Sequence, residues 1–246
     1  MQLTRPRPRP RPNIVAYLAG LLVLAMLAYG PIAQPDNYHH FADARGLLGV
    51  HGAGDVLSNL GFLLVGAYGL LRWRRAPPQV VARAPYGVFF AALALTAAGS
   101  AWYHLAPDDA RLVWDRLPIA LACGALLAAE LQRAYPGAAW ASISLPLLAV
   151  SALASVVWWS ITGDLRPYLL LQVAPPLLIP VLHWQAGAPM ARRAAFALAI
   201  VLYVLAKLCE VADGAVFEAL GVVSGHTLKH LLATAAAFVL VRQFRV

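Results

Sequence analysis

The chain has 246 residues, of which 61% are hydrophobic and only 12% are charged, a composition that excludes an ordinary soluble globular domain. Because a helix needs about 20 residues to cross a bilayer, the length allows seven or eight spans and no separate soluble domain. The formal charge of +8 does not indicate nucleic-acid binding, since the arginines stand in short clusters between apolar runs, where they act as topology signals.

Two segments precede the main body of the chain. Residues 1–13 contain an Arg-Pro repeat, and because proline lacks a backbone donor we expect a disordered basic tail on the cytoplasmic side. The apolar run that follows, residues 14–33, is long for a signal peptide and ends without a clear cleavage site. It is therefore predicted to be an uncleaved, extra N-terminal transmembrane helix.

The remaining residues, 34–246, are predicted to form one membrane domain. After a polar loop they contain seven further apolar runs that are long enough for helices. These runs are 56–73, 86–105, 113–133, 139–160, 168–184, 194–213 and 226–241. Together with the first run, they predict an all-α membrane protein with eight transmembrane helices.

Charge alternates along the connections between these runs. Arginines cluster before the first span and after the second, fourth, sixth and eighth spans, whereas the other loops are mainly acidic. The positive-inside rule then places both termini in the cytoplasm. With that orientation, the end of the third helix near His104, the start of the fourth near Asp115 and the start of the eighth at His226 all lie in the outer leaflet.

A candidate metal site follows from this placement. His226 and His230 are four residues apart in "SGHTLKHLL", so a helix would project both from one face. Such a pair alone can also be an interfacial polar patch. His104 supplies a third imidazole at the same expected depth, with Ser100 and Asp115 close by. Three histidines beside a carboxylate and a hydroxyl are typical of a catalytic zinc site with one open position.

Three segments carry a resemblance to a known family. "SNLGFLLVG", "GSAWYHLAPDDARLVWDRLPIA" and "SGHTLKH" are similar to motifs of the alkaline ceramidases, which belong to a wider group of membrane hydrolases together with the progestin and adipoQ receptors. The resemblance covers about residues 36–240 and implies a seven-helix core within 34–246. It implies zinc ligands at His104, His226 and His230, Ser100 near the substrate carbonyl, and Asp115 beside the water at the metal.

The same resemblance implies a reaction and a location. The substrate would be a ceramide-like lipid amide, cleaved to a fatty acid and an amine such as a sphingoid base. A bacterial member would lie in the inner membrane with its site toward the periplasmic leaflet, in contact with membrane lipids. The sequence indicates neither the acyl length nor the head group nor the oligomeric state.

Alternatives to this hypothesis stay open. A zinc-binding receptor without turnover would need the histidines but not Asp115 and Ser100, and a transporter would more often show paired discontinuous helices. Some relatives of the family also bind Ca²⁺ through acidic residues before the first core helix. Oxygen ligands of that kind are available here at Asp36, Asn37, Asp43 and Asp55.

Other polar residues within or near the apolar runs are interpreted structurally. Asp55 is expected to cap its helix, with Ser58 and Asn59 making interhelical hydrogen bonds. Two pairs on single helices are expected to be ion pairs, Lys207 with Glu210 and Glu130 with Arg133. The histidines outside the proposed site are expected to be solvated in the outer loop or to anchor a helix at the inner interface; they are His39, His40, His51 and His183.

Overall fold

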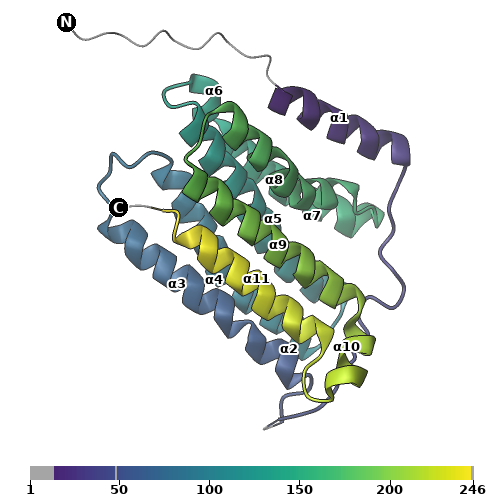
Figure 1. Ribbon diagram of the computed structural model, residues 1–246. Coiled ribbons are helices and arrows are strands. Elements are labelled where there is room, and N and C mark those ends of the chain that lie inside the picture. The colour runs from purple at the N-terminus through teal and green to yellow at the C-terminus, as the bar shows by residue number, and fades with distance from the viewer. Residues whose placement is uncertain (1–13, 48, 245–246) are drawn as a thin grey trace, which may run out of the picture.

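The computed structural model describes residues 14–47 and 49–244, and the predicted Arg-Pro tail at residues 1–13 lies outside them. The described chain is a helical bundle (Figure 1). Its helices are α1 (Ile14–Tyr29), α2 (Ala53–Ser58), α3 (Leu60–Arg75), α4 (Arg83–Leu105), α5 (Asp109–Ala134), α6 (Ala139–Ser142), α7 (Ser144–Thr162), α8 (Arg166–Gln185), α9 (Met190–Val211), α10 (Asp213–Leu220) and α11 (Gly225–Val241).

Six helical stretches of the described chain are long and apolar enough to cross a membrane, as expected of a membrane protein. They are Ala53–Arg75, Arg83–Leu105, Asp109–Ala134, Ala139–Thr162, Arg166–Gln185 and Met190–Val211. The predictions of an all-α architecture and of apolar spans are confirmed. The first and last helices, α1 and α11, are apolar but shorter, with 16 and 17 residues. Eight crossings therefore stay a prediction.

The two ends of the bundle differ in structure. The short helices α2 and α10 lie at one end, together with the start of α11, and α6 lies at the other (Figure 1). We call the first of these the α2/α10 end. Helix α10 lies in the connection between the predicted spans 194–213 and 226–241, and it was not predicted. Because α4 ends and α5 and α11 begin at the α2/α10 end, the polar residues near those three helix termini come together there.

Helices α4 and α5 approach closely beside Ser100 and Asp115. A Cβ atom added to Gly99 would collide with the backbone carbonyl of Trp114, so only glycine permits this packing. The two residues that follow in sequence, Ser100 on α4 and Asp115 on α5, are consequently held across one helix interface. Gly99 thus helps to set the position of both predicted site residues.

The predicted extra N-terminal helix corresponds to α1, although it ends at Tyr29 rather than at residue 33. It lies at the edge of the bundle (Figure 1), where it packs mainly on α8. Val15 is its only buried residue. The helix is therefore peripheral to the helices that carry the candidate site.

The predicted pairing of Glu130 with Arg133 is wrong. Glu130 is 1% exposed and pairs instead with Arg192 of α9, while it accepts hydrogen bonds from Tyr86 at 2.7 Å and from His183 at 2.8 Å. Arg133 turns toward the C-terminal segment and donates to the Gln243 carbonyl at 3.4 Å. Because Glu130 points into the bundle, its partners come from other helices rather than from its own. His183 is accordingly a buried partner of Glu130 and not an interface anchor.

Candidate metal centre

The three predicted ligand histidines come together in the structure. His104 lies in the last turn of α4, and His226 and His230 occupy the first turns of α11. Their side chains are buried, and one ligand atom from each lies within 4.8 Å of the others. Among the described residues this is the one group of three or more histidine, cysteine or acidic side chains that could hold a metal ion.

One pair of imidazole nitrogens has the separation expected around a tetrahedral ion. The Nε2 atoms of His104 and His226 lie 3.2 Å apart. Two nitrogens bound to zinc at its usual distance and at the tetrahedral angle are about 3.3 Å apart, which agrees with this separation. Three neutral nitrogen ligands are a common set for zinc, and they leave its fourth position open. The residues present therefore fit a zinc ion.

Ser58 of α2 fixes the orientation of His230. The Ser58 hydroxyl donates its one proton to the Asp55 carbonyl at 3.0 Å, so its oxygen can accept from the Nδ1–H of His230, 2.7 Å away. This tautomer leaves the lone pair of His230 on Nε2, where it is available to a metal. The predicted interhelical role of Ser58 is confirmed, but its contact with a ligand was not predicted. The same prediction is wrong for Asn59, whose side chain donates to the Asp55 carbonyl of its own helix at 2.8 Å.

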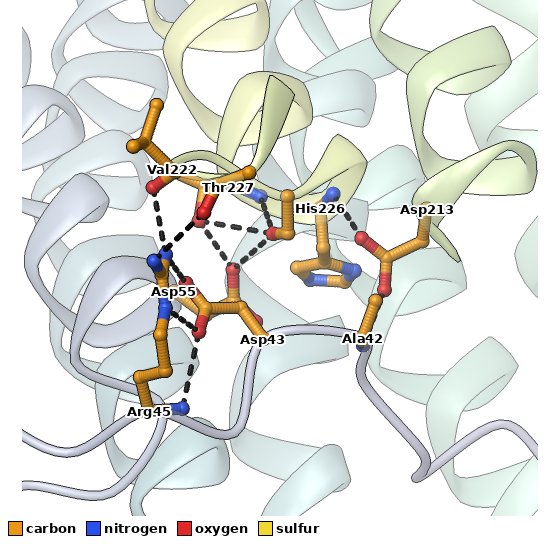
Figure 2. Close-up of polar contacts among 10 residues, drawn as sticks. Ala42, Asp43, Arg45, Asp55, Asp213, Val222, His226 and Thr227 are labelled. Carbon is orange, nitrogen blue, oxygen red and sulfur yellow. Dashed lines mark hydrogen bonds and ion pairs between the residues drawn. The ribbon is translucent and has the colours of Figure 1, made fainter. Parts of the chain in front are cut away.

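The start of α11 is held by two carboxylates (Figure 2). Asp213 Oδ1 accepts from the backbone N–H of His226 at 2.7 Å. Asp55 Oδ1 accepts from the hydroxyls of Thr227 at 2.6 Å and Ser224 at 3.1 Å. The N-cap of α2 is Gly52, so the prediction that Asp55 caps its own helix is wrong. Asp55 instead joins α2 to the helix that carries two of the ligands.

Residues 30–45, which we call the covering segment, cross the α2/α10 end over the histidines. The ring of Phe41 packs edge-on against His104 and His226, with centroid distances of 4.6 and 4.5 Å. The next residue, Ala42, donates its backbone N–H to Asp213 at 2.8 Å (Figure 2). Asp213 therefore positions both the covering segment and the backbone of a ligand.

Arg45 anchors the end of the covering segment. It donates to the carbonyls of Gly221 at 3.0 Å and Val222 at 2.7 Å, and it binds both carboxylate oxygens of Asp43 (Figure 2). The Arg45 guanidinium lowers the pKa of Asp43 below its usual value, because it donates hydrogen bonds to the carboxylate. Asp43 is thus an anchor in an ion pair at the α2/α10 end.

The residues predicted for calcium do not form a comparable cluster. Both oxygens of Asp43 are bound by Arg45, and Asp55 accepts from two hydroxyls of α11 and its N-cap. In the described parts of the chain, no group of three acidic side chains with metal-ligand spacing is found. A calcium site stays a prediction.

The histidines of the outer loop lie apart from the three ligands. His40 and His51 are exposed, as predicted. His39 is only partly exposed, because its ring nitrogens contact the Tyr103 hydroxyl at 2.9 Å and Asp109 at 3.1 Å. It holds the covering segment against the ends of α4 and α5.

A cavity of about 300 Å³ adjoins the histidines. Ser100, Asp115 and His230 line its polar part, and Asp115 has one buried carboxylate oxygen without a hydrogen-bond partner in the described chain. The lining continues between α4, α5, α8, α9 and α11 to apolar side chains such as Phe196 and Leu240. An apolar chain with a polar end matches this shape.

The cavity wall also contains the predicted ion pair of Lys207 with Glu210, which is confirmed at 2.8 Å. Lys229, between the two ligands of α11, binds the other oxygen of Glu210 at 3.0 Å. The pair therefore extends to a third residue and ties α9 to the ligand-bearing helix. The contact of Lys229 with Glu210 joins two helices, so spacing along one helix could not predict it.

Sequence comparisons give no relative on which a function could be based. No protein-family model matches the chain, and no curated protein matches it significantly. Function must therefore be inferred from the three histidines and the cavity beside them.

Proposed function

We propose that the protein is a zinc-dependent intramembrane hydrolase that cleaves the amide bond of a ceramide-like lipid to a fatty acid and an amine. One observation carries the proposal: three buried imidazoles with metal-ligand spacing adjoin a cavity lined by a carboxylate and a hydroxyl. A receptor or transporter that only binds metal would not need Asp115 and Ser100 at that place. The resemblance to the alkaline ceramidases supports the same reading.

His104, His226 and His230 would hold the zinc through one nitrogen each. When bound, zinc supplies Lewis acidity, which polarises a carbonyl and makes water a nucleophile near neutral pH. Ser58 keeps the Nδ1 proton of His230 directed away from the other two ligands. Phe41 excludes bulk water from above His104 and His226, so that charges at the site are only weakly screened.

Asp115 and Ser100 have distinct roles in the proposed reaction. Asp115 takes the proton of the attacking water and then passes it to the leaving amine, so it acts first as a general base and then as a general acid. Ser100 donates a hydrogen bond to the oxyanion that develops on the amide carbonyl. Both residues are buried and line the same cavity, which supports a common substrate for them.

The apolar part of the cavity suits an acyl chain, and its polar part suits the amide. In the proposed orientation both termini are cytoplasmic, and the α2/α10 end faces the periplasmic leaflet of a bacterial inner membrane. A lipid amide could then reach the site while its acyl chain stays in an apolar environment. The six long apolar helices support this membrane location.

The test combines metal analysis with product analysis on one purified preparation. The parent protein should carry about one zinc per chain and release fatty acid from at least one member of a panel of ceramides and simpler N-acyl amines. His230→Ala should lose both properties. Zinc at full occupancy without cleavage of any panel member would favour a binding protein, and cleavage that persists after zinc removal would contradict the mechanism.

A further inference from the structure

Arg116 follows Asp115 on α5 and lines the same cavity. It is 2% exposed and is one of the largest fully buried side chains among the described residues. Burial of a guanidinium is costly unless an opposite charge compensates for the lost hydration. It must therefore be asked which groups stabilise the buried charge of Arg116.

Among the described residues, Arg116 forms no ion pair with a carboxylate. In the described chain no acidic oxygen lies within 4 Å of it, whereas the less buried Arg166 and Arg192 pair with Asp164 and Glu130. One nitrogen of Arg116, Nη2, donates to the Gln34 side chain at 2.7 Å. Its Nε and Nη1 groups are buried without a hydrogen-bond partner in the described protein.

Aromatic rings surround the guanidinium instead. Its Cζ atom lies 3.8 Å from the ring centroid of Trp159, 5.1 Å from that of Tyr38 and 5.3 Å from that of Tyr168. Such rings stabilise a cation through the face of the guanidinium plane and leave the N–H groups at its edge free to donate. Nε and Nη1 lie on different edges of the guanidinium, but Nη2 has a second N–H, which forms a planar pair of donors with either Nε or Nη1. Such a pair matches a carboxylate or a phosphate.

The location of Arg116 indicates which part of a substrate it would meet. Its partner Gln34 belongs to the covering segment, so Arg116 stands at the α2/α10 end, whereas the apolar lining leads the other way to Phe196 and Leu240. An acyl chain in the apolar part would direct the amine portion of the amide toward the covering segment. The other cations of the cavity, Lys207 and Lys229, are already paired with Glu210.

We propose that Arg116 binds an oxyanion carried by the amine portion of the substrate, so that, within the ceramide-like lipid amides, N-acyl amines with a carboxylate or a phosphate near the amide are preferred over uncharged ceramides. This inference rests on the proposed function, because it takes the bound lipid to be the substrate. The anion site itself can be tested by lipid binding alone. Arg116 would determine specificity and would take no part in the bond cleavage.

The experiment uses the full-length, metal-loaded protein in neutral detergent and three lipids with the same chain. N-lauroylglycine carries a carboxylate, N-lauroylphosphoethanolamine carries a phosphate, and N-lauroylglycinamide is the neutral counterpart of the first. Binding is followed by tryptophan emission, since Trp159 contacts Arg116. At least one anionic lipid should bind about 10-fold more tightly than the neutral lipid or better, because a desolvated donor pair discriminates strongly against a ligand that leaves it unpaired. Carboxylate and phosphate are distinguished by which lipid shows the preference.

Arg116→Met should abolish this preference while it leaves the affinity for N-lauroylglycinamide within about two-fold. Arg116→Lys keeps the charge but not the planar edge, so it should retain part of the preference even if the methionine variant folds poorly. The matched control is Arg111→Met, because Arg111 lies on the same helix and pairs with Asp108. It should bind all three lipids as the parent does.

The outcomes separate this inference from the proposed function. Equal affinity of the parent for all three lipids, or a preference that survives in Arg116→Met, would overturn the anion site even if the lipids are cleaved. An Arg116-dependent preference without cleavage of any lipid supports the anion site and counts against the hydrolase.

Discussion

Ser58 Oγ and His230 Nδ1 lie 2.7 Å apart, which joins the short helix α2 to the second ligand of α11. Because the Ser58 proton is directed to the Asp55 carbonyl, the contact selects one tautomer of the imidazole. Ser58, which is not a candidate ligand, thus determines which nitrogen of His230 can bind a metal. This relationship leads to the first prediction.

Ser58→Ala should weaken zinc binding by about 10-fold to 100-fold, the usual effect of losing a hydrogen bond to a ligand histidine. The ligand nitrogens remain, so the metal should still bind at saturating zinc. Competition with a chelator of known affinity measures the change. Ser151→Ala, on the exposed surface of α7, is the control and should leave the affinity unchanged. Unaltered affinity in Ser58→Ala would show that the tautomer is fixed by other contacts.

The alanine variants His104→Ala, His226→Ala and His230→Ala should each lose most of the metal, because two nitrogen ligands rarely retain zinc. In the parent, metal occupancy should fall at acidic pH, since protons compete with the metal for the imidazole nitrogens. Elemental analysis after dialysis at a series of pH values checks both statements. His40→Ala, an exposed histidine of the outer loop, should behave as the parent. Full occupancy in any of the three ligand variants would remove that residue from the ligand set.

Asp115→Asn should retain zinc and lose lipid-amide hydrolysis by about 100-fold or more, because asparagine is nearly isosteric but cannot accept the proton of the attacking water. Ser100→Ala should lose about 10-fold to 100-fold, since one hydrogen bond to the oxyanion is removed. Zinc content and fatty-acid release are measured on the same samples. Loss of zinc in Asp115→Asn would make Asp115 a ligand or an anchor, and full activity would exclude it as the base.

The ion pair of Asp43 with Arg45 predicts a pH-dependent stability. The pKa of Asp43 is lower in the folded protein than in the unfolded chain, so its charge stabilises the fold above about pH 4. This stabilisation is lost as the pH falls through the lowered pKa. The melting temperature of Asp43→Asn should therefore lie below that of the parent at pH 7, and the two should converge at more acidic pH.

Both proteins are melted in the presence of a chelator from pH 7 to pH 3, so that metal loss does not contribute to the difference. Asp36→Asn serves as the control, because Asp36 is exposed on the same loop. A constant difference between the parent and Asp43→Asn over the whole pH range would mean that the Asp43 charge does not stabilise the fold.

The proposed topology places both termini in the cytoplasm and the covering segment outside it. Reporter domains fused after Val246 and inserted after Asp36 should therefore report opposite compartments. The alternation of arginine clusters along eight apolar runs is the physical reason. Two reporters in the same compartment would show that an even number of helices crosses between them and would remove the outer-leaflet placement of the site.

The helices could be predicted because apolar runs of sufficient length stand between polar connections. The three ligands could be predicted because His226 and His230 share a helix face and His104 shares their depth. The path of the covering segment could not, since Phe41 reaches the histidines only through contacts such as that of Ala42 with Asp213, 171 residues away in sequence. Local patterns carry no information about such distant partners.

Polar partners inside the bundle were difficult to predict for the same reason. Spacing along one helix suggested that Glu130 pairs with Arg133, but Glu130 is buried and meets Arg192 instead. Asp55 has the position of a capping residue in the sequence, yet it binds Thr227 of another helix. A buried charge selects its partner by the packing of the helices, which only the three-dimensional structure reveals.

Two of the three candidate ligands belong to α11, and His226 follows His104 by 122 residues. Until α11 is synthesised, the nascent chain therefore offers only one of the three imidazoles. Metal capture through this set would have to wait for α11, and a chain truncated before Gly225 could not acquire an ion through it. Metal content would then distinguish chains that contain α11 from chains that lack it.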